Sequence, residues 1–312
     1  MTPRAYQQVD VFTRIPYLGN ALGVVMDGSG LSDEEMQAFA RWTNLSETTF
    51  LLPPSPAAAA QGADYQVRIF TPADELPFAG HPTLGSCHAW LQAGGTPKAA
   101  GTIVQECAKG LVQLKRDGTR LAFAAPSLQR STPDSALIAQ VAAALGLRTE
   151  QIRAAQWLDN GPVWLGLLLD SMDTVLDLRP DHSALKGLAR GIGVAGMDVA
   201  PAAPDLIVRS NREARAFGGS SSTSAATLDD TPSIEVRFFA DDIGVTEDPV
   251  TGSFNASLAQ WLIADGIAPA RYVAAQGTCI GRAGRVFIEQ DAQGQVWVGG
   301  DSVTCIEGKV TL

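Results

Sequence analysis

The sequence predicts an α+β protein made of two related halves. One pattern occurs twice: a strand that carries Val-Arg, an acidic turn that contains proline and glycine, and a helix that ends in Trp-Leu. The first copy runs from Val67 to Leu91 and the second from Val236 to Leu262. The other strand signals pair locally instead of alternating with helices, which argues against a doubly wound parallel sheet. A duplicated unit of this kind predicts two similar halves that face each other, with chemistry at the seam.

The composition is that of a compact protein with a large core. Of the 312 residues, 46% are hydrophobic and 18% are charged, and this length is typical of about two domains. No apolar run reaches the roughly 18 residues that span a bilayer, and the first residues lack the apolar stretch of a signal peptide. The four cysteines form no C-x-x-C pair. Reduced thiols in a cytoplasmic protein are therefore expected.

The net charge of −10 excludes some partners. Nucleic acids and anionic membrane surfaces bind to clusters of Lys and Arg, so neither is expected as a partner of this acidic chain. An anionic small molecule remains compatible, because a local site can be positive in an acidic protein. The three histidines, His81, His88 and His182, are too scattered to predict a metal site, and no cofactor is expected.

The first half is predicted to cover residues 1–125. Ser32 and Glu35 form an S-x-x-E capping box, so a helix is expected from Ser32 to about Trp42. The proline- and alanine-rich segment Pro53–Gly62 is predicted to be a loop. The remaining elements of this half are expected as strands at 8–12, 22–26, 48–52, 67–70, 101–108 and 112–124 and a helix at 82–93.

The second half is predicted to cover residues 126–301, and a strand near 302–312 is a candidate to complete the first half. An apolar stripe predicts a helix that starts near Pro133 and stops at Gly146. The segment Gly218–Ser233 has no periodicity and is predicted to be either a solvated connector or a flap over a site. The other elements are expected as strands at 155–158, 163–169, 206–209 and 236–239 and a helix at 253–264.

Two motifs resemble functional signatures but lack the required context. Gly191–Gly196 matches G-x-G-x-x-G, yet a helix-like stretch precedes it and prolines follow it, whereas a dinucleotide site needs a strand before and a helix after. A glycine-rich turn is the prediction. Cys87 and His88 are neighbours on a predicted helix, where their side chains diverge by about 100°. Both are assigned to the core.

The two predicted helix starts are candidate anion sites. Gly80-His81-Pro82-Thr83 opens one helix and Thr251-Gly252-Ser253 opens the other. Free N–H groups at a helix start bind anions, and glycine lets another group approach the backbone. If the halves face each other, both starts converge in a geometry that suits a small carboxylate. The alternative is that each glycine only makes a tight turn and His81 only caps its helix.

Acidic residues near these starts could carry proton transfer. Glu47 lies between a helix and an apolar strand and is either a general base with a pKa raised by burial or an exposed loop acid. Asp248 is a second acid, a hydrogen-bonding orienter or a turn residue, and Glu75 and Glu247 share that ambiguity. Arg68 and Arg237 occupy equivalent strand positions and are expected to be structural or salt-bridged.

Several of these segments together resemble the PhzF-like phenazine biosynthesis family. They are Glu75–Gly85, Glu247–Ser253, the Gly19-Asn20-Ala21-Leu22 stretch and Ser46-Glu47-Thr48-Thr49-Phe50. The resemblance implies the diaminopimelate-epimerase-like fold, in which two pseudo-symmetric halves each roll a β-sheet around a central helix and the site lies between them. It usually also implies a homodimer.

The same resemblance implies roles for particular residues. The family's best-known member isomerises trans-2,3-dihydro-3-hydroxyanthranilate without a cofactor, and its catalytic glutamate matches Glu47. Its accompanying site residues match His81, Asp248 and Ser253. Ala21 stands where the family often has proline, and Phe254 follows Ser253 where a small residue is common. These departures bear on the substrate more than on the fold.

The leading hypothesis is an isomerase that moves a proton between carbons of a small, cyclic carboxylate. Glu47 would take and return the proton, while His81, Asp248 and Ser253 hold the substrate. Backbone groups at Gly80, Pro82, Thr83, Thr251 and Gly252, together with Asn20, would line the binding site. The alternatives are an epimerase or lyase that starts from the same proton abstraction, and a non-catalytic binding protein. Because Glu47 has no evident acidic counterpart in the second half, a single base is favoured over a two-base racemase.

Overall fold

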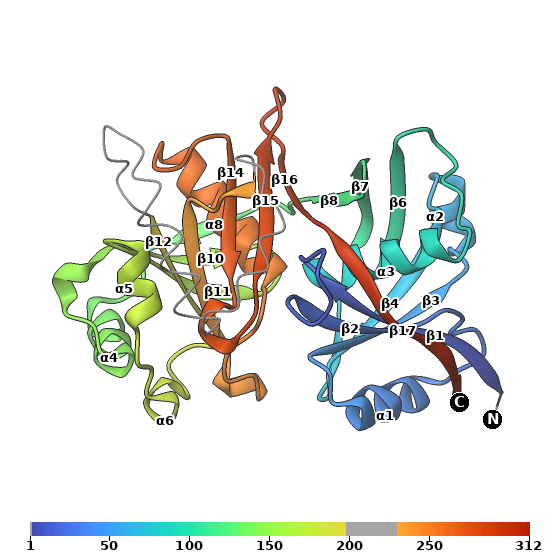
Figure 1. Ribbon diagram of the computed structural model, residues 1–312, viewed down its shortest axis with the longest axis horizontal. Coiled ribbons are helices and arrows are strands. Elements are labelled where there is room, and N and C mark those ends of the chain that lie inside the picture. The colour runs from blue at the N-terminus through green and yellow to red at the C-terminus, as the bar shows by residue number, and fades with distance from the viewer. Residues whose placement is uncertain (1, 198–229) are drawn as a thin grey trace. The chain divides into compact units, whose positions relative to one another are not determined.

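The computed structural model describes residues 2–197 and 230–312, which form two compact units (Figure 1). The first unit contains Met1–Pro126, Thr251–Ala256 and Gln290–Leu312, and the second contains Ser127–Val250 and Ser257–Glu289. The sequence predicted the boundary between the halves at 125/126, and of the C-terminal residues it assigned only 302–312 to the first half as a candidate strand. The strand expected at 206–209 and most of the 218–233 segment lie outside the described residues.

The elements of the first unit follow the predicted order with two corrections. They are β1 (Pro3–Val11), β2 (Asn20–Val25), α1 (Asp33–Thr43), β3 (Glu47–Leu52), α2 (Pro56–Ala60), β4 (Tyr65–Phe70), β5 (Glu75–Leu76), α3 (Gly80–Gln92), β6 (Thr102–Cys107), β7 (Gly110–Asp117), β8 (Arg120–Ala124), β16 (Val296–Gly300) and β17 (Ser302–Thr311). The expected loop at 53–62 contains α2, and the single strand expected at 112–124 is the hairpin β7–β8.

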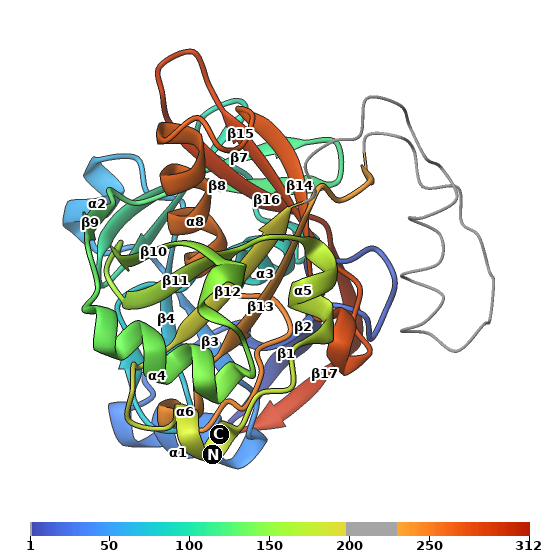
Figure 2. The ribbon, with the colours of Figure 1, turned by 90° about the vertical axis from the view of Figure 1, so that its left-hand side faces the viewer.

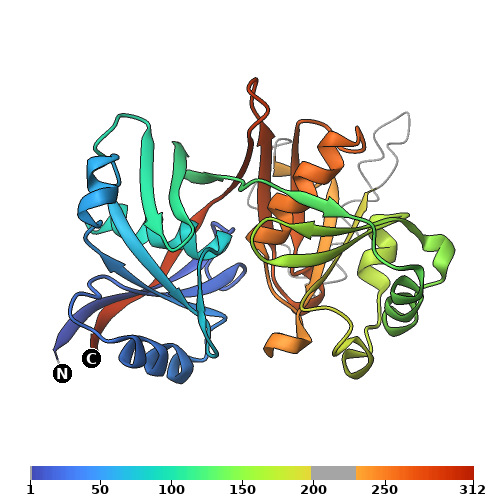
Figure 3. The same cartoon turned by 180° about the vertical axis from the view of Figure 1, so that it is seen from behind.

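The sheet of the first unit is rolled around α3. Its strands pair in the order β17–β1–β2–β3–β4–β6–β7–β8–β16. Helix α3 contacts β1, β2, β3, β4, β8 and β17, so strands from both ends of this order pack on it (Figure 3). Residues 80–87 of the helix are buried without exception. A helix enclosed in this way cannot slide, and its first turn is held in place.

The second unit has its own set of elements (Figure 2). They are β9 (Gln129–Ser131), α4 (Ser135–Leu145), η1 (Thr149–Gln151), β10 (Ile152–Asp159), β11 (Val163–Leu169), α5 (Met172–Asp177), α6 (His182–Leu185), β12 (Ile192–Met197), β13 (Ile234–Phe239), η3 (Asp241–Ile243), α8 (Gly252–Ala264, from Ser257 onward), β14 (Arg271–Gln276), η4 (Thr278–Ile280) and β15 (Gly284–Gln290). Helix α5 packs on β11, β12 and β13. Helix α8 is buried along most of its length.

The two sheets repeat one pattern of strand directions. In the first unit, β1 is antiparallel to β2, β2 is parallel to β3, β3 is antiparallel to β4, β4 is parallel to β6 and β6 is antiparallel to β7. The strands β10, β11, β12, β13, β14 and β15 follow each other with the same directions. Each unit also places a buried helix after its fourth strand, α3 or α8. The predicted α+β fold of two pseudo-symmetric halves is confirmed.

Local signals in the sequence explain where several helices begin and end. Ser32 caps α1, and the capping box with Glu35 forms through both of its hydrogen bonds. Helix α4 ends at Gly146, which adopts a left-handed conformation with φ of 71°. Helix α2 was missed because it is a single short turn, although Ser55 caps it and Pro56 occupies its first turn.

The G-x-G-x-x-G segment forms strand β12, which corrects the prediction of a turn. A Cβ atom on Gly196 would lie 2.1 Å from the carbonyl oxygen of Ser171, and one on Gly191 would lie 2.5 Å from the Phe238 ring. These glycines therefore allow α5 and the neighbouring strand to pack closely. They do not make a phosphate-binding loop.

The repeated Val-Arg strands carry a repeated ion pair, as the sequence predicts. Arg68 donates to both carboxylate oxygens of Glu75, at 2.8 and 2.6 Å. Arg237 binds Glu247 in the same fork, at 3.0 and 2.8 Å. The side chains of the first pair are 22% and 35% exposed, whereas both side chains of the second pair are 6% exposed. Arg237 also donates to the carbonyl oxygen of Leu178 at 3.0 Å.

Neutralising the two glutamates should have unequal effects on stability. We expect Glu247→Gln to lower the free energy of unfolding by about 3 kcal/mol, because it leaves a buried guanidinium without its counter-charge. The matched change Glu75→Gln removes one of two acidic partners of a more exposed arginine, which keeps its contact with Asp33 at 2.6 Å, and should cost about 1 kcal/mol or less. Urea unfolding of the two variants measures the difference. Equal losses would contradict the role of burial.

Candidate active site

Glu47 is the first residue of β3, where the chain enters the sheet after α1. The left-handed Asn44, with φ of 54°, ends the helix and turns the backbone toward the strand. The Glu47 side chain is 16% exposed, and its Oε2 is buried with no hydrogen-bond partner among the described residues. Burial raises the pKa of Glu47 to about 7, and a hydrogen bond from Ser46 opposes that rise. This carboxyl group is therefore near half-ionisation at neutral pH.

His81 lies beside Glu47 and is the second residue of α3. Its side chain is 4% exposed, and its Nδ1 is 3.5 Å from Oε2 of Glu47. That separation is longer than an ordinary hydrogen bond, and the contact is an ion pair only if the imidazole is protonated. Two residues that are distant in sequence, and that were predicted independently as an acid and a helix-start residue, thus meet in the first unit.

The first turns of α3 and α8 touch through their glycines within the first unit. A Cβ atom built on Gly80 would lie 2.9 Å from Cα of Gly252, and one on Gly252 would lie 3.0 Å from the backbone nitrogen of His81. Glycine is therefore required at both positions for the backbones to approach. The first N–H groups of a helix have no intrahelical partner, so a helix start can hold an anion.

The residues around Gly252 are buried. Thr251 and Ser253 are 8% and 7% exposed, and Phe254 is fully buried. Asn255 donates from its side-chain amide to the carbonyl oxygen of Thr251 at 3.0 Å, which ties the first turn of α8. Ser253 follows its glycine as His81 follows Gly80, so the two helices present different side chains at one equivalent position.

Asn20 and Ser46 form a polar group next to Glu47. Ser46 Oγ donates to Oδ1 of Asn20 at 3.4 Å, and Asn20 is 2% exposed. Ser46 was not among the predicted site residues, although it belongs to the same Ser-Glu-Thr segment that drew attention to Glu47. Its hydroxyl lies between Asn20, the first residue of β2, and Glu47 on β3, and its one proton serves one of these two acceptors at a time.

Pro82 and Thr83 follow His81 in the first turn of α3, and both are buried. Oγ1 of Thr83 accepts a hydrogen bond from the amide of Gln105 at 3.1 Å, and Gln105 in turn accepts one from the Tyr65 hydroxyl at 3.0 Å. The Thr83 side chain is thus engaged in the core. Its backbone N–H also donates within the helix start, to the carbonyl oxygen of Ala79 at 3.2 Å, so a role for Thr83 in substrate binding stays a prediction.

Asp248 belongs to the second unit, where its backbone is fixed on both sides. Its N–H donates to the carbonyl oxygen of Phe238 at 2.9 Å, and its own carbonyl oxygen accepts from the Gln276 amide at 3.0 Å. Glu75 and Glu247, which shared its ambiguity in the sequence, bind the two repeated arginines instead. The catalytic role of Asp248 stays a prediction.

The repeat places no acid opposite Glu47. Strand β12 is the counterpart of β3 in the second half. When the two strands are aligned through their pairing with the equivalent strands β13 and β4, Gly191 takes the position of Glu47. The pairing with β2 and its counterpart β11 puts Ile192 there instead. Neither residue ionises, so under either register the position equivalent to Glu47 carries no acid.

Two further features concern metals and membranes. Within residues 2–197 and 230–312, no group of three or more His, Cys, Asp or Glu side chains is arranged to hold a metal ion. In the same part of the chain, no helix combines the length and the apolar character needed to cross a bilayer.

Comparison with known proteins identifies the family. The model of the family described as phenazine biosynthesis-like protein matches residues 9–308. Antisense-enhancing sequence 1 of Schizosaccharomyces pombe is 34% identical, covering 99% of both chains. Trans-2,3-dihydro-3-hydroxyanthranilate isomerase of Pseudomonas aeruginosa is 31% identical, covering 98% of this chain and 99% of that protein. The crystal structure of a PhzF-family protein of Bacillus anthracis shares the fold over 100% of both chains, with a TM-score of 0.76 and 20% identity.

These matches extend over nearly the whole chain and include a relative above 30% identity that is named an isomerase. They agree with the rolled sheets and the glycine-led helices described above. The chain therefore belongs to the phenazine biosynthesis-like protein family, and it is an enzyme of the isomerase class that acts on a small molecule.

Proposed function

We propose that this protein is a cofactor-independent isomerase that moves a proton between carbons of a small, cyclic carboxylate, with Glu47 as the general acid/base. The observation that carries the proposal is the buried Oε2 of Glu47, which lies 3.5 Å from Nδ1 of His81. A general base works best when its pKa is near the operating pH. Burial gives Glu47 that property.

Proton transfer follows from these positions. The ionised Glu47 takes a proton from one carbon and, as the neutral acid, returns it to another carbon of the same substrate. His81 stabilises the charge that develops on the substrate, and the N–H groups in the first turns of α3 and α8 hold the carboxylate. The close approach of Gly80 and Gly252 supports this arrangement, because it brings two sets of backbone donors together. Ser253 would hold the substrate from the start of α8.

The substrate named for the Pseudomonas aeruginosa relative is the first to test. Trans-2,3-dihydro-3-hydroxyanthranilate is a cyclic carboxylate and fits the proposed class. Phe254 is fully buried at the position that follows Ser253, so its bulk can distinguish this site from that of relatives with a smaller residue. The homodimer implied by the family resemblance and the role of Asp248 remain predictions.

The alternatives make different predictions in deuterated water. An isomerase moves a double bond and returns hydrogen to a different carbon, whereas an epimerase inverts a stereocentre at the carbon that lost its proton. A binding protein exchanges no substrate proton. The lack of an ionisable counterpart at Gly191 or Ile192 favours a single base and therefore the isomerase. Two-base racemisation would require an acid there.

Replacement of Glu47 should remove catalysis and leave the fold intact. We expect Glu47→Gln to lower turnover of trans-2,3-dihydro-3-hydroxyanthranilate by 10²–10⁴-fold, the usual contribution of an acid/base group. NMR in deuterated water follows both double-bond movement and deuterium uptake. The matched control is Glu307→Gln, an exposed acid on β17. Full activity of Glu47→Gln would sink the assignment.

The pH dependence should report the raised pKa of Glu47. Only the ionised carboxylate takes a proton, so kcat/KM should fall about tenfold per pH unit below about 7. Ser46→Ala should move this limb to higher pH, because the Ser46 hydrogen bond lowers the pKa of Glu47. Ser131→Ala, an exposed serine of β9, should leave the limb unchanged. An acid limb near 4.5 in the wild type would contradict the burial of Glu47.

Glu47 should also cost stability at neutral pH. A folded-state pKa above the ordinary value of 4.5 means that the folded protein holds this proton more tightly than the unfolded chain. Stability therefore falls as pH rises from about 4.5 to about 7. We expect Glu47→Gln to be more stable than the wild type at pH 8, by on the order of 2 kcal/mol, and the gap to close near pH 4. Urea midpoints across this range test it, with Glu307→Gln as the control.

A further inference from the structure

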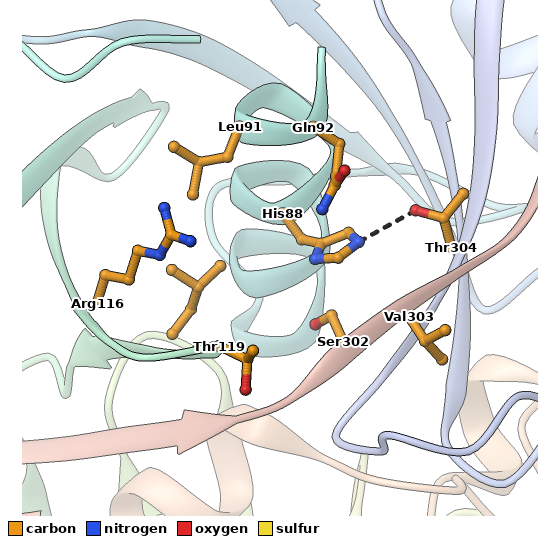
Figure 4. Close-up of a pocket in the computed structure, with 9 residues that line it drawn as sticks. His88, Leu91, Gln92, Arg116, Thr119, Ser302, Val303 and Thr304 are labelled. Atoms are coloured by element: carbon orange, nitrogen blue, oxygen red, sulfur yellow. Dashed lines mark hydrogen bonds between the residues drawn. The ribbon is translucent and has the colours of Figure 1, made fainter. Parts of the chain in front are cut away.

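We propose that the first unit carries a second binding site, for a small organic carboxylate with an apolar body, at the opposite end of α3 from His81. The site is a pocket of about 360 Å³ between α3, the β7–β8 hairpin and the start of β17 (Figure 4). Its volume lies within the range of small-molecule sites. The inference does not rest on the proposed catalytic function.

The pocket lies at a gap in the rolled sheet. Strand β17, at one end of the strand order, pairs with β1, and β16, at the other end, pairs with β8; no described pairing joins β17 to β8. His88, Leu91 and Gln92 of α3 line the pocket between these strands. A second pocket of about 300 Å³ shares Leu91 and Arg116 with the first. The two pockets therefore meet at the Arg116 side chain.

Arg116 supplies positive charge that no described residue uses. Its Nε donates to the carbonyl oxygen of Gly118 at 3.0 Å, and its terminal nitrogens have no hydrogen-bond or ion-pair partner within residues 2–197 and 230–312. A guanidinium with two free nitrogens matches a carboxylate in a bidentate fork. The lining of both pockets includes this arginine and no Asp or Glu, although the chain has a net charge of −10.

Asp301, which precedes the lining residue Ser302, is already neutralised. Asp301 is 4% exposed and accepts from Arg14 Nε at 2.8 Å, from Arg120 Nε at 3.3 Å and from the Thr119 hydroxyl at 2.8 Å. It therefore does not compete for Arg116. Neither Asp117 nor Asp301 lines the pocket, and the charged side chain in its lining is Arg116, which favours an anionic ligand.

Other lining groups fit the rest of such a ligand. Oγ of Ser302 is buried and has no hydrogen-bond partner in the described part of the chain. A hydroxyl reorients about one torsion, and a ligand oxygen would supply the missing partner. His88 is held by Thr304 at 3.0 Å, and burial lowers its pKa, so it contributes a neutral ring. Leu91 and Leu121 offer apolar surface to the body of the ligand.

Calorimetric titration with benzoate tests the site, and benzamide is its uncharged control. We expect the wild type to bind benzoate at this pocket, in addition to any benzoate held at the candidate active site, and Arg116→Gln to weaken binding at this pocket at least tenfold, with benzamide weak in both. Lys115→Gln is the matched control, because Lys115 is the neighbouring cation but points to the Trp297 ring, 3.5 Å from its centre. It should bind benzoate like the wild type.

Two further variants keep the result unambiguous. Gln92→Trp fills the pocket from the exposed surface of α3 and leaves Arg116 in place, so it should also abolish benzoate binding at this pocket. His81→Ala alters the candidate active site and should leave this binding unchanged, which separates the two sites. The proposal is overturned if no heat is seen up to about 10 mM benzoate, if Arg116→Gln binds as the wild type does, or if His81→Ala removes the binding.

Discussion

The enclosure of α3 by the sheet of the first unit is the constraint on which the candidate site depends. Strands β1, β2, β3, β4, β8 and β17 contact this helix, and residues 80–87 are buried. Its packing leaves no space for larger residues, since a Cβ atom on Gly85 would lie 2.5 Å from Cδ2 of Leu22. A helix held so tightly fixes the position of its first turn. The imidazole of His81 is therefore set against Glu47 by packing that lies outside the site.

The same enclosure explains why Glu47 is suited to proton transfer. A carboxylate loses hydration when it is buried, and this penalty raises its pKa unless donors compensate. Ser46 compensates only in part. An acid that is held at the edge of a core, and is destabilising in its ionised form there, is a candidate for proton transfer. Burying the ionised Glu47 lowers the stability of the folded state. The tight packing between α3 and its sheet holds the fold together in spite of this loss.

The sequence predicted the features that depend on local chemistry or on repetition. The Ser32–Glu35 capping box, the stop at Gly146 and the duplicated arginine strands needed only short-range patterns, and the structure confirms them. The prediction of a single strand at 112–124 failed although Asp117-Gly118 was a hairpin signal. The glycines of β12 were misread because their reason, the carbonyl oxygen of Ser171, is distant in sequence. The pocket at Arg116 could not be predicted, since it joins three elements that only the fold brings together.

The two halves share one backbone arrangement but carry different side chains on it. Strand directions, the arginine–glutamate fork and a glycine at the helix start recur in both halves, and all of them act through the backbone or through structural pairing. Backbone N–H groups at a helix start bind an anion whatever side chain follows. The residue after each glycine was therefore free to diverge, to His81 in one half and Ser253 in the other. Glu47 likewise has no acidic counterpart at Gly191 or Ile192, because the repeated backbone arrangement does not depend on the side chain at that position. A single acid/base group on a duplicated fold, as proposed for Glu47, is compatible with this division between backbone and side chain.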